Sequence, residues 1–562
     1  MAIQPVTDRI NLTYQNHEDK PIELPFRVLV IADLTADSRS LDITQVKPTR
    51  LDLDSDALLS AFNVNLAINI ENLLNESGDV VEVDIGLYSV SDFEPASLLE
   101  SIPELSDAFQ VYQQLSNDKI KASNLIDSLS EYGFDVDDSL DYSDRLVIQQ
   151  VMHDRINDQL NLVLQHPTFR KLESSWRSLA FLNEYIDGKE NVDLVVANIS
   201  KQALQEDFED SPDVTQSALF NHIYTQEFGQ FGGRPYSLVL GDYEFSNQAQ
   251  DIALLTSMSK LCAMSHCPFI SAASGKMFGV DSYSDFSRIR DIQSHFDQPA
   301  FAKWNSFRET DDSRYVCLTL PKFLLRAKHT MLGNGFEFNE HAVQNQVGLW
   351  GNSAYPLVTR FINSFKTFRW FINVTGDEYG LIDTIKIHES ATKLGSLIPT
   401  EVLISDRTAN ELIASGFTPL VVRRRTGNAG FVSVPSCHAI AHDKSSHAEL
   451  LNHQLETQIP YILISCRFSQ YIKVMQRENM GSWLTRSQID QSINRWLKQY
   501  VSDMDNPAPA VRARRPLRNA HVNVRDVEGK AGWFLSTITI TPHFKFMGQS
   551  FTLTERAKLE KA

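Results

Sequence analysis

Residues 226–246 read QEFGQFGGRPYSLVLGDYEFS, and this stretch gives the first clear indication of the fold. Its apolar run YSLVLGD (236–242) predicts a buried strand, because the run is short, rich in Val and Leu, and bounded by turn residues. Three glycines, Gly229, Gly232 and Gly233, come just before this run. They raise the alternative of a phosphate-binding loop, and therefore of an enzyme.

The order of elements disfavours a phosphate loop. Such a loop follows a strand and opens a helix, whereas here a helical stretch (217–228) ends, the glycines follow, and a strand begins. The spacing also fits neither GxGxxG nor the P-loop pattern. We expect a structural turn, with Gly229 in a positive-φ conformation after the helix and Gly232 and Gly233 leading into the strand.

Further strands flank this one along the chain. FRVLVIAD (26–33), VDLVVANI (192–199) and PFISAAS (268–274) are nearly continuous apolar runs, which is typical of strands buried on both faces. A helix is predicted at 250–265, between two of the strands. The β-α-β alternation predicts an α/β fold of mixed α+β character, with a partly parallel sheet.

The N-terminal third contains a second group of elements. A strand is predicted at 80–88, a helix at 91–115, and two more helices at 147–164 and after Pro167. Between them, residues 117–146 are mostly acidic and polar, so we interpret them as a connector and the best domain boundary.

Alternating strands are predicted near both ends of the chain. In DRINLTYQN (8–16), Ile10, Leu12 and Tyr14 share one face. Near the C-terminus, a helical region (461–500) with a break at Met480-Gly481 precedes a hairpin of HVNVRDV (521–527) and WFLSTITIT (533–541) around EGKAG, and then SFTLTE (550–555). Strands outside the main sheet either pair within the chain or complete a sheet in a neighbouring molecule, and the sequence leaves both alternatives open.

Composition excludes several classes of function. The 562 residues carry a formal net charge of −19, which disfavours nucleic acid as a partner. The five cysteines show no CxxC spacing, which indicates reduced thiols, and no apolar run approaches the ~20 residues of a membrane span. No signal-peptide pattern is present. We expect a cytoplasmic protein without membrane insertion.

A few residues could carry chemistry. Asp33 and Asp242 follow predicted buried strands, a common place for functional carboxylates, although capping or turn roles are more frequent. The segment PSCHAIAHDKSSH offers Cys437 and three histidines, but the spacing fits no zinc motif and a surface loop is favoured. We therefore assign no catalytic residue, cofactor or metal. Two arginine clusters (423–425 and 512–518) either form a solvated surface or dock an acidic neighbour, such as another copy.

The chain resembles the contractile sheath proteins of type VI secretion systems. The first ~120 residues resemble the small subunit, TssB or VipA, in the stretches ELPFRVLVIADLT (23–35), AFNVNLAINI (61–70) and YSVSDFEP (88–95). The remainder resembles the large subunit, TssC or VipB. Its carrying stretches include HPTFRKLESSWRSL (166–179), QSALFNHIYTQEFGQFGGRPYSLVLGDYEF (216–245), FAKWNSFRETDDSRYVCLTLPKFLLR (301–326), ISDRTANELIASGFTPLV (404–421), QIPYILISCRFSQYIKVMQRENMG (458–481) and RRPLRNAHVNV (514–524).

This resemblance implies a multi-domain contractile tail-sheath fold and a division of the chain. Residues 1–116 would be the small-subunit-like region, 117–146 a connector, and 147–562 the large-subunit-like region, with 450–562 as an inner sheath subdomain. The chain is shorter than the two subunits laid end to end, and the shortening falls around 117–146. In the family, an AAA+ ATPase, ClpV, grips a short helix near the large subunit's N-terminus. No match to that helix is found here, which leaves recycling by ClpV open.

The function implied is a non-enzymatic structural subunit. It would polymerise into a helical tube around an Hcp-like inner tube, start from a baseplate, and drive the inner tube outward on contraction. Strand pairing between subunits is expected at Ile10, Leu12, Tyr14, Phe534, Ile538 and Ile540. Contact with the inner tube is expected at Arg486, Asp490, Arg495 and Lys498. The alternatives are an α/β phosphotransferase or hydrolase that uses Asp33 or Asp242, and a scaffold that docks to sheaths without polymerising.

Overall fold

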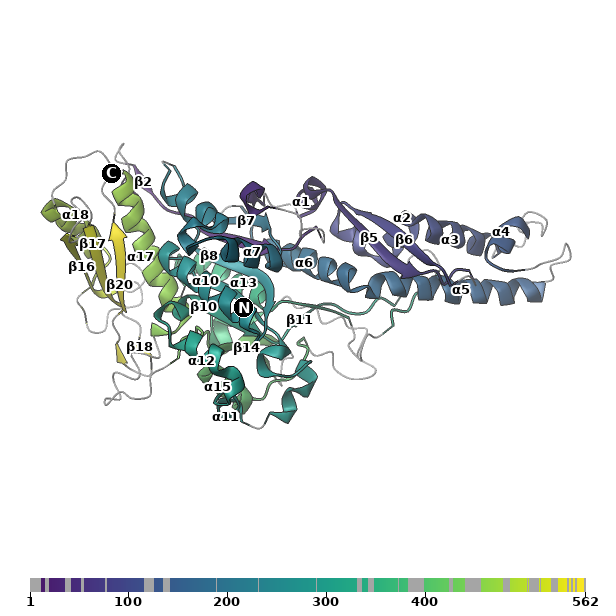
Figure 1. Cartoon of the computed structure of the whole chain (residues 1–562). Coiled ribbons are helices and arrows are strands. Elements are labelled where there is room, and N and C mark those ends of the chain that lie inside the picture. The colour runs from purple at the N-terminus through teal and green to yellow at the C-terminus, as the bar shows by residue number, and fades with distance from the viewer. Residues whose placement is uncertain are drawn as a thin grey trace.

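The computed structural model describes most of the chain. The described residues are 12–15, 20–35, 42–51, 55–75, 78–115, 126–134, 142–188, 190–230, 232–289, 291–330, 336–341, 348–371, 373–382, 399–423, 428–439, 456–478, 486–502, 504, 515, 517–526, 534–542, 545–546, 549–550 and 553–559. Figure 1 shows an elongated molecule, in which an arm and a C-terminal unit extend from opposite sides of a central α/β body.

The central body is built on a nine-stranded sheet in the order β13-β15-β14-β10-β9-β8-β3-β7-β4. Six neighbouring strands from β14 to β7 run parallel, and the short strands at the two ends are antiparallel. This confirms the predicted mixed α/β class. The strands are β3 (Phe26–Ala32), β4 (Thr49–Arg50), β7 (Val192–Asn198), β8 (Leu238–Phe245), β9 (Phe269–Ala273), β10 (Val316–Leu320), β13 (Leu381–Ile382), β14 (Phe417–Val422) and β15 (Ala429–Phe431).

Consecutive residues of the inner strands are buried, which means that both faces of the sheet are covered. Val28, Val30 and Ile31 of β3 are all fully buried, as are Leu238, Val239 and Leu240 of β8. The continuous apolar runs in the sequence are therefore explained by burial on both sides. The helices of the body are α6 (Pro167–Asn183), α7 (Lys201–Asp210), α8 (Ala218–Phe220), α9 (Gln226–Phe228), α10 (Ala249–Ser265), α11 (Ile292–Phe296), α12 (Ala302–Glu309), α13 (Ala354–Phe368), α14 (Gly376–Tyr379) and α15 (Asp406–Ala414).

The arm contains most of the N-terminal third, packed on one long helix (Figure 1). Its elements are α1 (Ser55–Phe62), β5 (Val64–Glu71), β6 (Val80–Leu87), α2 (Pro95–Ser101), α3 (Pro103–Leu115), α4 (Ile126–Glu131) and α5 (Tyr142–Gln165). The expected single helix at 91–115 is wrong. A 3₁₀ turn (Val90–Phe93), α2 and α3 replace it, because Pro103 keeps Ile102 extended, at φ −88° and ψ 115°.

The expected connector at 117–146 is more structured than its composition suggests. α4 lies within it, and α5 starts at Tyr142, five residues before the predicted helix start at 147. The guanidinium of Arg155 on α5 donates to the carbonyl of Tyr132 at 2.7 Å and lies 4.9 Å from the ring centroid of Phe134. These contacts hold residues 126–134 against α5.

The C-terminal unit combines two helices with a three-stranded antiparallel sheet, β16-β17-β20. Its elements are α17 (Ile459–Glu478), α18 (Arg486–Lys498), β16 (Leu517–Asp526), β17 (Phe534–Pro542) and β20 (Leu553–Leu559). The predicted hairpin is confirmed by the register of β16 with β17. The last strand starts at Leu553 and not at Ser550, and the predicted break at Met480-Gly481 lies outside the described residues.

Two hydrophobic cores support this arrangement. The large core runs through the body and the arm, and a smaller one joins α17 and α18 to the β16-β17-β20 sheet and to the N-terminal residues Leu12, Tyr14 and Leu24. Residues near both ends of the chain, from Leu12 to Ile540, therefore share one core. The short strands β1 (Tyr14–Gln15) and β2 (Pro21–Ile22) pair with each other beside it.

The glycine-rich stretch is a turn, as predicted, but with a different glycine in the left-handed conformation. Gly229 has φ −80°, so the positive φ expected there is wrong; Gly232 has φ +82° instead. A Cβ on Gly233 would lie 2.5 Å from the carbonyl oxygen of Glu227, which explains the need for glycine at that position. Arg477 of α17 donates to the carbonyls of Glu227 and Gly233 at 2.8 and 2.9 Å, so the turn holds the C-terminal unit to the body.

Candidate functional site

We define the seam as the contact between the N-terminal residues 23–115 and the body. Its centre is β3, which lies between β7 and β8 in the nine-stranded sheet. All seven residues of β3 are in register with β7, from Phe26↔Val192 to Ala32↔Asn198, and four are in register with β8. An N-terminal strand is therefore an interior strand of a sheet whose other long strands come from later in the chain.

Aromatic contacts extend the seam on both sides of β3. The ring centroid of Phe26 lies 5.4 Å from that of Phe365 on α13. On α6, Phe169 meets Phe93 at 5.5 Å and Trp176 meets Phe62 at 6.1 Å, both in edge-to-face geometry. Such pairs contribute about 0.5–1.5 kcal/mol each beyond their buried area.

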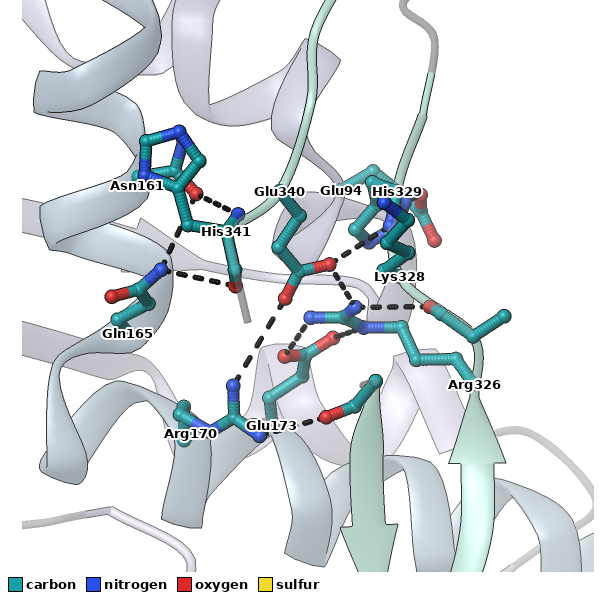
Figure 2. Close-up of polar contacts among 12 residues, drawn as sticks. Glu94, Asn161, Gln165, Arg170, Glu173, Arg326, Lys328, His329, Glu340 and His341 are labelled. Carbon is teal, nitrogen blue, oxygen red and sulfur yellow. Dashed lines mark hydrogen bonds and ion pairs between the residues drawn. The ribbon is translucent and has the colours of Figure 1, made fainter. Parts of the chain in front are cut away.

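A buried group of charged side chains lies next to these rings, and we call it the charge network (Figure 2). Its centre is Glu173 of α6, which is fully buried. The guanidinium of Arg326, at the end of β11 (Phe323–Arg326), donates to both carboxylate oxygens of Glu173 at 2.7 and 2.9 Å. Its remaining Nη1 donates to Glu340 at 2.8 Å. A planar guanidinium thus joins two carboxylates that are far apart in the sequence.

The charge network also crosses the seam. Arg177 of α6 donates from Nε to Glu173 at 2.7 Å and from Nη2 to Glu94 of the N-terminal region at 2.8 Å. His329 places its Nδ1 3.5 Å from Glu94, and its backbone N–H donates to Glu340 at 2.8 Å. The network therefore joins α6 and the segments after β11 to the N-terminal region.

The environment shifts the pKa of several groups in the network. Burial alone would raise the pKa of Glu173, but the charges and hydrogen bonds of Arg326 and Arg177 outweigh it and hold that pKa below its ordinary value. Burial, together with the charge of Arg326, lowers the pKa of His329. Both shifts favour an ionised Glu173 and a neutral His329 at neutral pH.

Arg170 completes the network on its other side. Its Nη1 lies 4.0 Å from the carboxylate of Glu340, and its Nη2 donates to the carbonyl of Gly348 at 2.8 Å. Gly348 has φ +95°, and β12 (Leu349–Gly351) follows it directly. The network thus also fixes the backbone at the start of β12.

We call the second site the terminal cluster, formed by Leu12, Thr13 and Tyr14 against α17 and α18. Tyr471 of α17 donates its hydroxyl to the carbonyl of Leu12 at 2.6 Å and accepts from the N–H of Leu24 at 2.8 Å. Trp496 of α18 donates its indole N–H to the carbonyl of Thr13 at 2.8 Å. Aromatic side chains thus replace strand partners for this part of the backbone.

The structure places the predicted strand-pairing residues in two different environments. Leu12 and Tyr14 are buried in the terminal cluster, and Ile10 lies outside the described residues. Ile538 and Ile540 are buried in β17, which also contains Phe534. Since β17 pairs with β16 on one side and β20 on the other, it has no free edge in this arrangement. Pairing of β17 with a neighbouring molecule therefore requires one of those strands to leave.

The four charged residues predicted to meet an inner tube do not form one uniform patch. All four belong to α18, where Arg495 and Lys498 are exposed. Asp490 is half-buried and accepts the N–H of Val524 on β16 at 3.3 Å. Its carboxylate therefore holds the helix to the sheet. The side chain of Arg486 lies outside the described residues.

The two candidate catalytic aspartates have partners within the chain. Asp33 follows β3, as predicted, and its carboxylate lies 2.8 Å from the ammonium of Lys171. Asp242 lies inside β8 and not after it, at a shift in the register between β8 and β9. The hydroxyl of Ser175 donates to the carboxylate of Asp242 at 2.6 Å. Burial raises the pKa of the Asp242 carboxyl above its ordinary value.

The cysteines and histidines do not assemble a metal site in the described part of the chain. Within those residues, no three His, Cys, Asp or Glu side chains are grouped so that they could hold an ion. Cys437 is buried, and His438 places Nδ1 3.0 Å from both Ser313 Oγ and the carbonyl of Thr310. His442 and His447 lie outside the described residues.

Sequence reasoning missed the charge network. A signal was present, because Glu173 lies four residues after Phe169 and three before Trp176, on the buried face of the same helix. A lone carboxylate on an apolar helix face predicts a buried partner. The identity of that partner, Arg326, was not predictable, since 153 residues separate the two.

Models of three sheath families match the chain over consecutive ranges. The model described as Type VI secretion system, VipA, VC_A0107 or Hcp2 matches residues 4–130. The EvpB/VC_A0108 tail sheath N-terminal domain matches residues 146–438, and the EvpB/VC_A0108 tail sheath gpW/gp25-like domain matches residues 448–559.

Two individual proteins are also similar. The type VI secretion system sheath protein TssC1 of Pseudomonas aeruginosa PAO1 is 34% identical over 420 residues, which cover 73% of this chain and 84% of that protein. The sheath tail protein Lin1278 from Listeria innocua is 12% identical, with 60% of each chain covered and a TM-score of 0.29, a likeness too distant to carry an argument. Among the described residues, no helix is both long and apolar enough to span a bilayer.

Proposed function

The chain belongs to the type VI secretion contractile sheath family, as a structural subunit in which small- and large-subunit regions share one polypeptide, and we propose that these two regions act as one sheath protomer. The single observation that carries the proposal is the position of β3. An N-terminal strand paired on both sides inside the body sheet makes residues 23–115 an integral part of that body. We propose the division into 1–116, 117–146 and 147–562, with 450–562 as the inner subdomain.

In this proposal the seam keeps the protomer rigid while the lattice rearranges. Contraction slides rigid protomers from one packing into another of lower energy, and no chemistry in the subunit is needed. Asp33 and Asp242 then serve structural roles, since each carboxylate contacts a side chain of α6. The assembly works in the cytoplasm, where the thiols of the five buried cysteines stay reduced.

The chain ends are the proposed links between protomers. On assembly, the stretch with Ile10, Leu12 and Tyr14 and the strand with Phe534, Ile538 and Ile540 exchange into the neighbouring protomer. In the isolated chain, Leu12 and Tyr14 are buried in the terminal cluster, and Ile538 and Ile540 are buried in β17. Such head-to-tail exchange need not close into a ring, so it produces a filament. The terminal cluster suits exchange, because only two residues of β1 pair with β2.

The proposed partner on the inside of the tube is an Hcp-like tube, and a baseplate starts assembly. Of the predicted contact residues, Arg495 and Lys498 are exposed on α18. Their charges can pair with the inner tube and fix how α18 is aligned on it. Arg486 belongs to the same proposal, whereas Asp490 acts indirectly by holding α18 to β16. Reversing Arg495 and Lys498 to Glu should leave protomers folded and prevent assembly around the inner tube.

Electron microscopy of the purified full chain tests the proposal. We expect long hollow tubes; compact particles with a bound nucleotide, or monomers under every condition, would contradict it. Deletion of residues 1–16 should abolish tubes and leave folded protomers. Deletion of residues 1–7 is the matched control, because it keeps the alternating stretch that begins at residue 8, and tubes should remain.

A further inference from the structure

The β5-β6 sheet on the arm is incomplete as a sheet. Its two strands have eight residues each and pair in antiparallel register at every position, without a bulge. In the described part of the chain, neither strand has another strand beside it. Half of the backbone N–H and C=O groups on each strand therefore point outward without a sheet partner. Figure 1 shows these strands on the arm, away from the nine-stranded sheet.

The edges of this sheet lack most of the usual protection. Natural proteins guard exposed edges with charged side chains, above all lysine, with proline, with bulges or with very short strands. The sequences VNLAINIE and VVEVDIGL contain no lysine, arginine or proline, and the strands are longer than the mean strand of about 5–6 residues. In contrast, the edge strands of the nine-stranded sheet, β4 and β13, have only two residues each. An unguarded edge of this length indicates that another segment covers it.

The two faces of the sheet define what that segment must look like. The inner face is apolar and buried, with Leu66 and Ile68 of β5 and Val83 and Ile85 of β6. The outer face is exposed and carries carboxylates, since Glu82 is opposite Asn69 and Asp84 is opposite Ala67. A third strand would therefore place alternate side chains over an apolar layer and beside carboxylates.

The charge of the whole region strengthens this pattern. Residues 51–118 contain 14 Asp and Glu but no Lys, Arg or His, although the complete chain carries 52 Lys and Arg. No basic side chain of this region neutralises the carboxylates of the outer face. A positively charged segment would be attracted at long range and held beside Glu82 and Asp84.

We propose that the β5-β6 sheet binds an extended, basic segment of a different protein as its third strand. That segment carries Lys or Arg at alternate positions, with apolar or β-branched residues between them. Pairing along the backbone supplies affinity, and the alternation supplies specificity. A second copy of this chain is the alternative occupant, and the experiment below separates the two cases. The carboxylates exclude nucleic acid, whose phosphates they repel.

A labelled heptapeptide of alternating lysine and valine, with lysine at both ends, is the first probe. Its binding to the full chain can be followed by fluorescence anisotropy. We expect saturable binding at one peptide per chain. The double variant Glu82→Lys/Asp84→Lys should weaken it at least about tenfold. The matched control is Glu209→Lys/Asp210→Lys, which makes the same change of charge at exposed positions of α7 and should leave binding nearly unchanged.

Backbone methylation separates strand addition from general charge attraction. Two versions of the peptide carry N-methyl groups on opposite alternate sets of amides. If the peptide adds as a strand, only the set whose amides face the sheet abolishes binding. Equal binding of both versions, or equal weakening by the two double variants, would overturn the proposal. Association of the unliganded chain with itself that is lost in Glu82→Lys/Asp84→Lys would also overturn it, because the occupant would then be a second copy.

Discussion

The seam and the terminal cluster both bring N-terminal residues against later parts of the chain, but they do so by different means. The seam holds β3 by parallel pairing on two sides, aromatic packing and a buried charge network. The terminal cluster holds residues 12–15 by a two-residue strand and the polar ends of three aromatic side chains, those of Tyr471, Trp496 and Tyr500. The contacts of the seam can break only when the body unfolds, whereas the terminal cluster can open while the body stays folded. Our proposal uses both kinds of contact, a rigid one inside the protomer and an exchangeable one between protomers.

The largest effect is expected from breaking the charge network. Arg326→Ala leaves the buried carboxylates of Glu173 and Glu340 without their shared partner, a change that typically costs about 3–5 kcal/mol. We expect the body and the arm to lose stability together, seen as a lower denaturant midpoint in both. A normal midpoint, or loss of the arm alone, would show that the seam is not one unit.

Acid should weaken the seam by a smaller amount. The folded-state pKa of His329 lies below its ordinary 6.5 because of burial and Arg326, so protons favour the unfolded chain as pH falls below about 6.5. The pKa of Glu173 is also lowered from its ordinary 4.5. The ionised carboxylate therefore stabilises the folded chain above about pH 4.5, and this stabilisation is lost as the pH falls below that value.

Thermal unfolding between pH 8 and pH 4 measures this effect. The transition temperature should fall toward acid, and His329→Gln should reduce the part of the fall that begins near pH 6.5, to which the half-buried His166 also contributes. An identical pH profile in His329→Gln and the parent chain would exclude a role for this histidine.

A local effect is expected in the terminal cluster. Tyr471→Phe removes the hydroxyl that donates to Leu12 and accepts from Leu24, which leaves buried backbone groups unpaired at a cost of about 1–3 kcal/mol. Limited proteolysis should cut ahead of residue 24 much faster, while the unfolding transition of the body stays in place. If the body is destabilised to the same extent, the two regions are not independent.

The smallest effect is expected for a salt bridge at the surface of the same seam. Lys171→Ala removes the ion pair with Asp33, but the lysine side chain is 62% exposed. Such pairs contribute about 0–1 kcal/mol, so the denaturant midpoint should barely change. Lys171→Ala is also the matched control for Arg326→Ala, since both remove a cation that pairs with a carboxylate across packed elements.

Four of the six parallel strands of the sheet, β3, β7, β8 and β9, were predicted from the sequence, because burial on both faces leaves a continuous apolar run; β10 and β14 were not predicted. The predicted strands at 26–33, 192–199 and 268–274 match β3, β7 and β9 to within one residue at each end. Boundaries set by backbone geometry were less predictable. The split at Ile102-Pro103 was missed, and positive φ was assigned to Gly229 when Gly232 adopts it, since local spacing does not decide which of three glycines turns the chain.

The sites were much harder to predict, because they depend on contacts between distant residues. The alternation at 8–16 marked Leu12 and Tyr14 as buried, but their aromatic partners lie more than 440 residues away, and no local pattern points to them. Asp490 looked like a surface charge on α18, yet it binds the backbone of β16. Local periodicity indicates which residues are buried but not what they meet.

Hydrogen exchange of the full, unassembled chain tests the central claim most directly. If the seam is permanent and the terminal cluster exchangeable, amides of β3 should exchange only through global unfolding. The amides of residues 12–15 should then exchange through a smaller opening that is insensitive to low concentrations of denaturant. Exchange of both segments with the same free energy and the same denaturant dependence would contradict the account.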